Sequence, residues 1–153
     1  MNALETVRDW LTTFPQSSVL TGFSVDYTDK IPSTGGILPD GLVELNRSRD
    51  IVGNVTVTNQ YNFGLYYVFE KAPNDDVGAA ENADWIVDLQ EWVQEQSATG
   101  AAPVFGDDPR EERIIAQNGT LLETDKEGTG VYMVQLSVRF IKKFREENKW
   151  LVN

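Results

Sequence analysis

A helical spacing of apolar residues opens the chain. Leu4, Val7 and Leu11 follow one another at intervals of three and four, and Pro15 ends the pattern. This spacing places the three side chains on one face of a helix. We therefore predict a helix over about residues 2–14.

The same spacing returns in the middle of the chain. After an acidic loop over residues 73–81, Asn82 is a plausible N-cap for a second helix over about residues 82–96. The stripe that this helix would bury is Ile86, Leu89 and Val93.

A period of two predicts strands elsewhere. The two longest alternations cover residues 61–71 and 131–144, and we expect the first, rich in aromatic residues, to be the central strand of a sheet. Shorter alternations lie at 23–27, 43–46 and 51–58. The pair Asn118-Gly119 is typical of a two-residue hairpin and predicts short strands on either side of it.

Glycine and proline mark the remaining connections. Residues 28–41 contain two prolines and three glycines, which predicts a flexible loop or arm. Residues 145–153 form a charged tail that ends in apolar side chains. No linker divides the chain, so we expect a single α+β domain over residues 1–153, with a twisted, mainly antiparallel sheet packed against two main helices.

Composition narrows the chemistry. The 153 residues include no cysteine and no histidine, which excludes disulfides, thiolate metal sites and catalytic Ser-His-Asp or Cys-His groups. No apolar run reaches the length of about 20 residues that a membrane helix needs. The N-terminus lacks the pattern of a signal peptide, so a protein made in a cytoplasm is expected.

The net charge of −11 is unevenly distributed. Residues 71–130 hold 14 acids against 4 bases, whereas residues 131–153 hold 2 acids against 5 bases. The acidic pairs neither match a calcium loop nor form a two-metal pattern, and Gly35-Gly36 lacks the lysine of a phosphate loop. We accordingly assign no catalytic, cofactor-binding or metal-binding residue and expect no enzyme.

The order of four segments is similar to that in a known family of proteins. These are the opening helix with Trp10-Leu11 and Phe14-Pro15, the aromatic strand from Tyr61 to Phe69, the acidic loop leading into Leu89-Gln90-Glu91-Trp92, and the strand from Val131 to Phe140. In this order the chain resembles the minor capsid or tail-terminator proteins of long-tailed phages and prophages of Gram-positive bacteria, over roughly residues 3–141.

The resemblance implies a structural role in the virion. Such proteins are made in the host cytoplasm and assemble as a ring, typically a hexamer, on the tail tube at the head–tail junction. The ring ends polymerisation of the tube protein and offers a docking surface to the head-completion protein. DNA passes through it without specific binding. A monomer in solution that assembles only on the tube is compatible with this role.

Two groups of residues are candidates for that role. Contacts between subunits or with partners are expected from Trp10, Ile31, Ile37, Leu38, Lys142, Lys143, Trp150 and Leu151. An acidic lumen or rim that repels DNA phosphates is expected from Asp75, Asp76, Asp107, Asp108, Glu111 and Glu112.

Other functions remain open at this level. A head–tail connector or another minor capsid component would have a similar size and composition. An acidic protein could also imitate DNA and inhibit a host nuclease or repressor. An enzyme that uses carboxylates alone would need a tight polar pocket with raised carboxyl pKa values.

Overall fold

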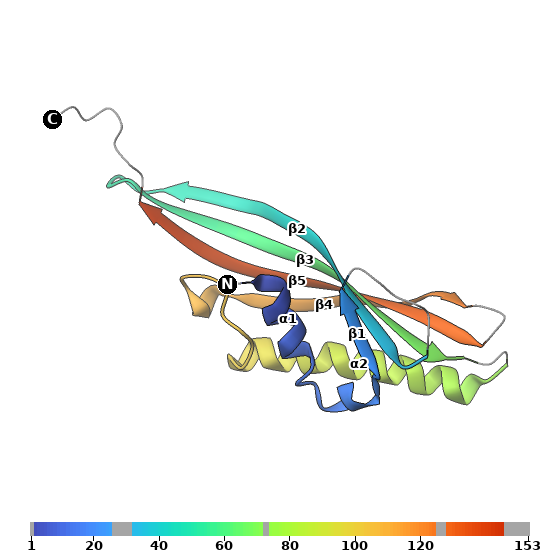
Figure 1. Cartoon of the computed structure of the whole chain (residues 1–153). Coiled ribbons are helices and arrows are strands. Elements are labelled where there is room, and N and C mark those ends of the chain that lie inside the picture. The colour runs from blue at the N-terminus through green and yellow to red at the C-terminus, as the bar shows by residue number, and fades with distance from the viewer. Residues whose placement is uncertain (1, 26–31, 72–73, 125–127, 146–153) are drawn as a thin grey trace.

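A five-stranded sheet with helices on one face forms the framework of the protein (Figure 1). The computed structural model describes residues 2–25, 32–71, 74–124 and 128–145. The strand order is β1-β2-β3-β5-β4. The bounds are β1 (Gly22–Val25), β2 (Thr34–Arg49), β3 (Asn54–Glu70), β4 (Arg113–Thr124) and β5 (Thr129–Arg145). Only the β1–β2 pairing is parallel, so the predicted single α+β domain with a mainly antiparallel sheet is confirmed.

The central strand is the predicted aromatic one. β3 pairs with β2 on one side and with β5 on the other over its whole length. Its alternation places Phe63, Leu65 and Tyr67 on the face that the helices cover, where each is at most 5% exposed. Residues 51–58 and 61–71 were expected to form separate strands. Instead, residues 54–70 form one strand, and residues 50–53 form the turn that joins it to β2.

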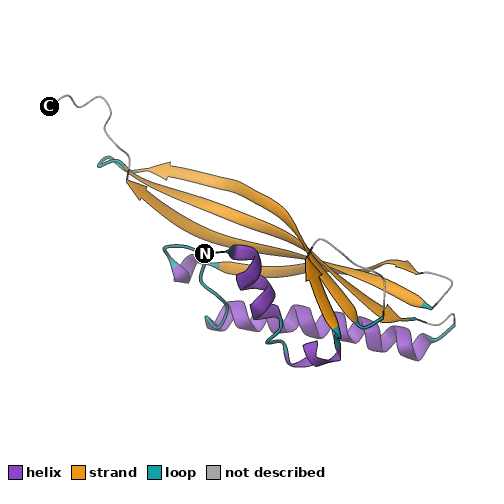
Figure 2. Ribbon diagram, viewed as in Figure 1, coloured by secondary structure: helices purple, strands orange, loops and turns teal. Residues whose placement is uncertain are grey.

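Two helices lie on this face of the sheet (Figure 2). α1 (Ala3–Leu11) agrees with the predicted first helix, and the 3-10 turn η1 (Pro15–Val19) follows it. α2 (Asp76–Thr99) buries the predicted stripe of Ile86, Leu89 and Val93. A second 3-10 turn, η2 (Pro109–Glu111), precedes β4. No helix among the described residues is apolar enough over a sufficient length to cross a membrane.

The start of α2 differs from the prediction. The helix begins at Asp76, because the side chain of Asp75 caps it by accepting a hydrogen bond of 2.9 Å from the Gly78 amide. Residues 76–81 are therefore helical and not loop. Asn82 lies inside the helix, where its side chain donates to the Glu70 carbonyl. Gly78 and the neighbouring acidic residues are typical of a loop, so the sequence pattern did not predict a helix start here. The Asp75 cap nevertheless stabilises it.

Aromatic rings join the helices to the sheet. Trp85 is 4.9 Å from Tyr67 and 5.0 Å from Phe69 between ring centroids, in edge-on geometry. Trp10 stacks on Trp92 at 5.0 Å, and its indole N–H donates to Gln96. Such aromatic pairs contribute about 0.5–1.5 kcal/mol each beyond their buried area.

The predicted loop or arm at residues 28–41 is wrong over its second half. Residues 34–41 belong to β2, while residues 28–31 lie outside the described part of the chain. Gly35 and Gly36 are buried. A Cβ atom at Gly35 would stand 2.7 Å from the Phe23 ring, so glycine here allows Phe23 to pack on the sheet. Pro39 lies beyond the end of β1, next to a bulge, where an edge strand tolerates proline.

The predicted hairpin at Asn118-Gly119 is also wrong. Residues 113–124 form one strand, and the register shifts between Gln117 and Thr120. Asn118 adopts a left-handed conformation with φ of 57°, as a residue in a bulge does. A Cβ atom at Gly119 would stand 2.5 Å from the Ile86 side chain. The pair thus bends β4 and lets α2 approach it closely.

Candidate functional site: a sheet extension and an acidic helix

Part of the sheet extends beyond the helices (Figure 1). β3 has 17 residues and spans about 56 Å at 3.3 Å per residue, whereas the 24 residues of α2 span about 36 Å at 1.5 Å per residue. We name the projecting part, residues 42–60 and 139–145, the sheet extension. It consists of the ends of β2, β3 and β5 and the turn between β2 and β3.

The sheet extension exposes apolar side chains. It contains six of the twelve large apolar side chains that are exposed among the described residues. The six are Leu42, Val43, Leu45, Ile51, Val52 and Phe144. At its tip Ile51 is fully exposed and Val52 is 70% exposed. A concentration of exposed apolar residues is typical of a surface that binds another protein.

The tip is nevertheless an ordered turn. The Asp50 carboxylate accepts hydrogen bonds from the amides of Asn54 at 2.9 Å and Val52 at 3.0 Å. These amides, that of Asn54 above all, hold the pKa of Asp50 below its ordinary value. Gly53 completes the turn with φ of 88°. The turn therefore holds Ile51 and Val52 at the end of the sheet, pointing into solvent.

The two faces of the sheet extension differ in how they are covered. On the face that continues the core, Val57 is 4% exposed although no helix of the described residues lies over it. Its cross-strand neighbours are Arg47 and Lys142, whose aliphatic stems are long enough to cover it. Arg47 also forms an exposed ion pair of 2.6 Å with Glu44, a kind of contact that contributes little to stability.

The opposite face, together with the adjacent start of β4, carries four exposed cations, which we name the cationic patch. They are Arg113, Arg139, Lys143 and Arg145. Arg113 and Arg139 are direct cross-strand partners, and like charges in such positions destabilise a sheet. Lys143 and Arg145 follow Arg139 at even spacing, so they share its face. Among the described residues, none of the four forms an ion pair.

α2 carries a corresponding row of acids, which we name the acidic stripe. Its members are Glu81, Asp84, Asp88, Glu91 and Glu95, at spacings of three and four. All but Asp88 are exposed, and Asp88 accepts a hydrogen bond of 2.9 Å from Gln16. α2 contains no lysine or arginine. Each neighbouring acid pair costs the helix about 0.2–0.5 kcal/mol, because like charges lie on one face.

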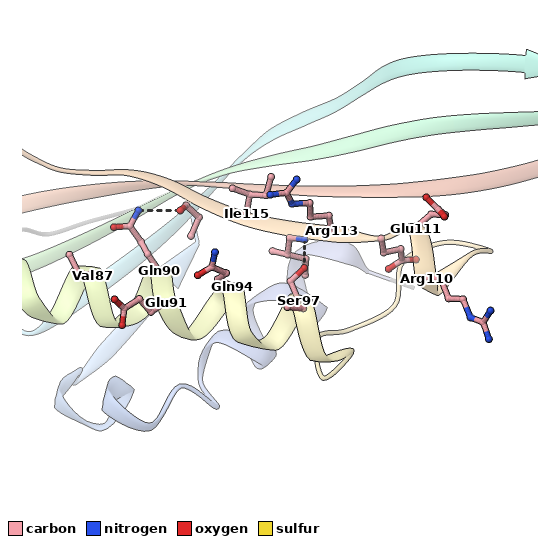
Figure 3. A pocket seen from close by; sticks show the side chains of 13 residues that line it. Val87, Gln90, Glu91, Gln94, Ser97, Arg110, Glu111, Arg113 and Ile115 are labelled. Carbon is pink, nitrogen blue, oxygen red and sulfur yellow. Dashed lines mark hydrogen bonds between the residues drawn. The ribbon is translucent and has the colours of Figure 1, made fainter.

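A groove of about 730 Å³ lies between α2 and β4 (Figure 3). Gln90 donates across it to the Ala116 carbonyl at 3.1 Å, and Ser97 accepts from the Ile114 amide at 2.9 Å. Its remaining lining is a mixture of aliphatic, amide and charged side chains. Within the described ranges no three carboxylates are placed to hold a metal ion. The hydrogen bonds across the groove join the helix to the strand.

The predicted interface residues are dispersed in the fold. Trp10 and Ile37 are buried in the core of the subunit, at 7% and 0% exposure. Neither side chain can therefore contact another subunit or a partner protein. Leu38 is half-buried and lines a groove of about 430 Å³ on the sheet face opposite the helices. Lys142 and Lys143 point to opposite faces of β5, because they are consecutive in a strand. Ile31, Trp150 and Leu151 lie outside the described residues.

The predicted acidic residues form two separate groups. Asp75 and Asp76 lie at the start of α2, whereas Asp107, Asp108, Glu111 and Glu112 come after its end, before and within η2 and just ahead of β4. The side chains of three of the six accept hydrogen bonds from backbone amides. Besides the Asp75 cap, Asp107 accepts from the Lys143 amide at 2.7 Å, and Glu112 accepts from the amides of Phe105 and Gly106. These three carboxylates have local structural roles.

Two features of the surface were not predicted from the sequence. The Arg113–Arg139 pair depends on the register of β4 and β5, which no local pattern specifies. The exposed tip could have been found, because Asp50 and Gly53 are three residues apart, as in a turn. Ile51 and Val52 were instead assigned to a strand, since they extend its apolar run.

No protein-family model and no curated protein matches this chain. Function is therefore inferred from three surfaces: the apolar tip of the sheet extension, the cationic patch and the acidic stripe.

Proposed function

We propose that this protein is a non-enzymatic virion component that assembles as a ring on the end of a phage tail tube, ends tube polymerisation and offers a surface to the head-completion protein. The observation that carries this proposal is the sheet extension with its exposed apolar tip, Ile51 and Val52. A projecting surface of this kind suits contact with other protein subunits better than it suits binding of a small molecule.

The ordered turn at the tip favours docking of a partner protein. Its turn is held by the hydrogen bonds to Asp50, so a partner would bind a preformed shape and lose little conformational entropy. The two residues at the tip would bury nearly all of their apolar area against a partner, at about 25 cal/mol per Å². The tip is accordingly the best site on this chain for the tube protein.

The unequal charge distribution also suits a ring on a DNA-filled tube. The net charge of −11 repels DNA at long range, so DNA can pass without being retained. Arg139, Lys143 and Arg145 of the sheet extension form no ion pair among the described residues, so they could contact acidic protein surfaces.

The test is tube polymerisation with purified tube protein, followed by electron microscopy. The wild-type protein is expected to stop growth and to form a ring at one tube end. Val52→Asp is expected to abolish capping, because a carboxylate at the tip would have to be desolvated on docking. The matched control is Val77→Asp, which changes an equally exposed valine, 71% against 70%, in the first turn of α2.

The outcomes separate the possible positions in the virion. Capping by Val77→Asp but not by Val52→Asp supports the proposal. Unrestricted tube growth in the presence of wild-type protein would overturn it. If the protein then bound to tailless heads, a head–tail connector would take its place.

A second candidate is an acidic DNA mimic, which the acidic stripe favours. The stripe places a carboxylate about every 5 Å along the helix axis, from a spacing of three to four residues at 1.5 Å each. One strand of DNA carries a phosphate about every 3.4 Å along its axis, so the stripe is less densely charged. Co-purification of a host DNA-binding enzyme that Glu91→Gln releases would favour this candidate.

A further inference from the structure

We infer that the acidic stripe on α2 of one copy binds the cationic patch on the sheet extension of a second copy, so that subunits join head to tail. This inference deepens the proposed ring and rests on it for its biological setting. Its occupant is a second copy of this chain, and the contact consists of carboxylates against guanidinium and ammonium groups. All members of the stripe and the patch except the half-buried Asp88 are exposed in the single subunit.

In the described part of the chain, no ion pair involves a member of the acidic stripe or of the cationic patch. The stripe has no cation on its own helix, and the patch includes two arginines directly opposite each other. Like charges held together in this way are stabilised by an oppositely charged partner.

The neighbours of the cationic patch in β3 are uncharged, and the Asp107 carboxylate beside Lys143 accepts from its backbone amide. On the same face, the cross-strand partners of Lys143 and Arg139 in β3 are Thr56 and Gln60. Both side chains can donate and accept hydrogen bonds. The patch therefore offers an anionic partner four cations and polar neighbours, without a carboxylate at these positions to compete.

The two surfaces lie on opposite sides of the fold. α2 covers one face of the sheet, and the acidic stripe is on the side of α2 that faces away from the buried Leu89 and Val93. The cationic patch is on the other sheet face, because it alternates with the buried Val138 and Phe140 in β5. One subunit cannot join its own two surfaces. Contact between copies is thus heterologous, and such contacts close into a ring when the rotation between copies permits.

Charge reversal tests the contact in the full chain. Arg139→Glu with Lys143→Glu reverses the patch, and Asp84→Lys with Glu91→Lys reverses the stripe. Either pair alone is expected to lower the amount of multimer on tail tubes at least tenfold. A chain with all four substitutions is expected to recover it, because the attraction is restored with opposite signs. Circular dichroism verifies that each variant is folded.

Cysteine cross-linking gives a second readout. The chain has no native cysteine, so Glu91→Cys with Arg139→Cys introduces one thiol on each surface. Oxidation in the assembled state is expected to give a ladder of covalent multimers. Either single-cysteine variant is expected to give at most a dimer, since a heterologous contact needs one thiol of each kind.

The results distinguish this inference from the proposed function. If wild-type rings cap tubes but the four-substitution chain does not assemble, the contact is overturned and the proposed function stands. If the ladder forms although tubes are not capped, the contact stands and the proposed function falls. If no ladder forms and double-stranded DNA is retained by wild-type protein but not by Arg139→Glu with Lys143→Glu, the patch binds nucleic acid and the inference is overturned.

Discussion

The covered half of the sheet and the sheet extension are built from the same strands but have different energetic roles. Under the helices, Leu65 of β3 and Val134 of β5 are completely buried, and the aromatic side chains pack around them. In the sheet extension, neither strand is covered by a helix of the described residues, and β3 begins at an exposed apolar turn. A continuous strand can thus be buried in the core at one end and expose apolar side chains at the other.

The largest expected effect is in the covered half, at Trp85. Trp85→Ala is expected to lower the free energy of unfolding by about 3–5 kcal/mol, because it removes a ring that contacts Phe14, Tyr67 and Phe69. Urea denaturation followed by circular dichroism measures it. Val52→Ala at the tip is the control and is expected to change stability by less than about 0.5 kcal/mol. Equal losses in the two variants would refute the division between the regions.

A smaller effect is expected where α2 approaches β4. Gly119→Ala is expected to cost about 1–3 kcal/mol, because the new methyl group would overlap the Ile86 side chain at 2.5 Å. The matched control is Gly22→Ala, where no heavy atom lies within 4 Å of the new Cβ. Thermal unfolding of both variants measures this difference in stability. A Gly119→Ala variant as stable as Gly22→Ala would show that α2 does not pack closely here.

Alkaline pH is expected to weaken the covered half. Burial raises the pKa of Tyr67 above its ordinary value of 10.0, so the folded state keeps the phenol proton that the unfolded state loses. The stability from this group is fully present below pH 10 and decreases as the pH rises above it. Unfolding free energies measured from pH 8 to pH 11 are expected to fall less in Tyr67→Phe. Parallel curves for the two proteins would contradict this.

The smallest effect is expected at the tip of the sheet extension. Asp50→Ala removes the acceptor for the amides of Val52 and Asn54, so these amides are expected to exchange hydrogen faster. Amides of the covered half are expected to exchange as in the wild type. Because the pKa of Asp50 is lowered, its contribution is present above the ordinary value of 3.8 and is lost as the pH falls below it. Unchanged exchange at Val52 would show that the carboxylate does not hold the turn.

The sequence by itself determined the faces of the main elements. The alternation in β3 and β5 and the stripe in α2 correctly identified the side chains that face the core, because burial of apolar area is the dominant local signal. The central position of β3 followed from its aromatic content. Both helices were located from spacing alone, although the cap at Asp75 was missed.

Only the tertiary structure decided what glycine, asparagine and proline do. Gly35 and Gly119 look like loop residues, yet they make room for Phe23 and Ile86, which lie far from them in sequence. The register of β4 and β5 placed Arg113 opposite Arg139, and the length of the strands relative to α2 created the sheet extension. These features depend on contacts between distant segments, and no local pattern of residues encodes them.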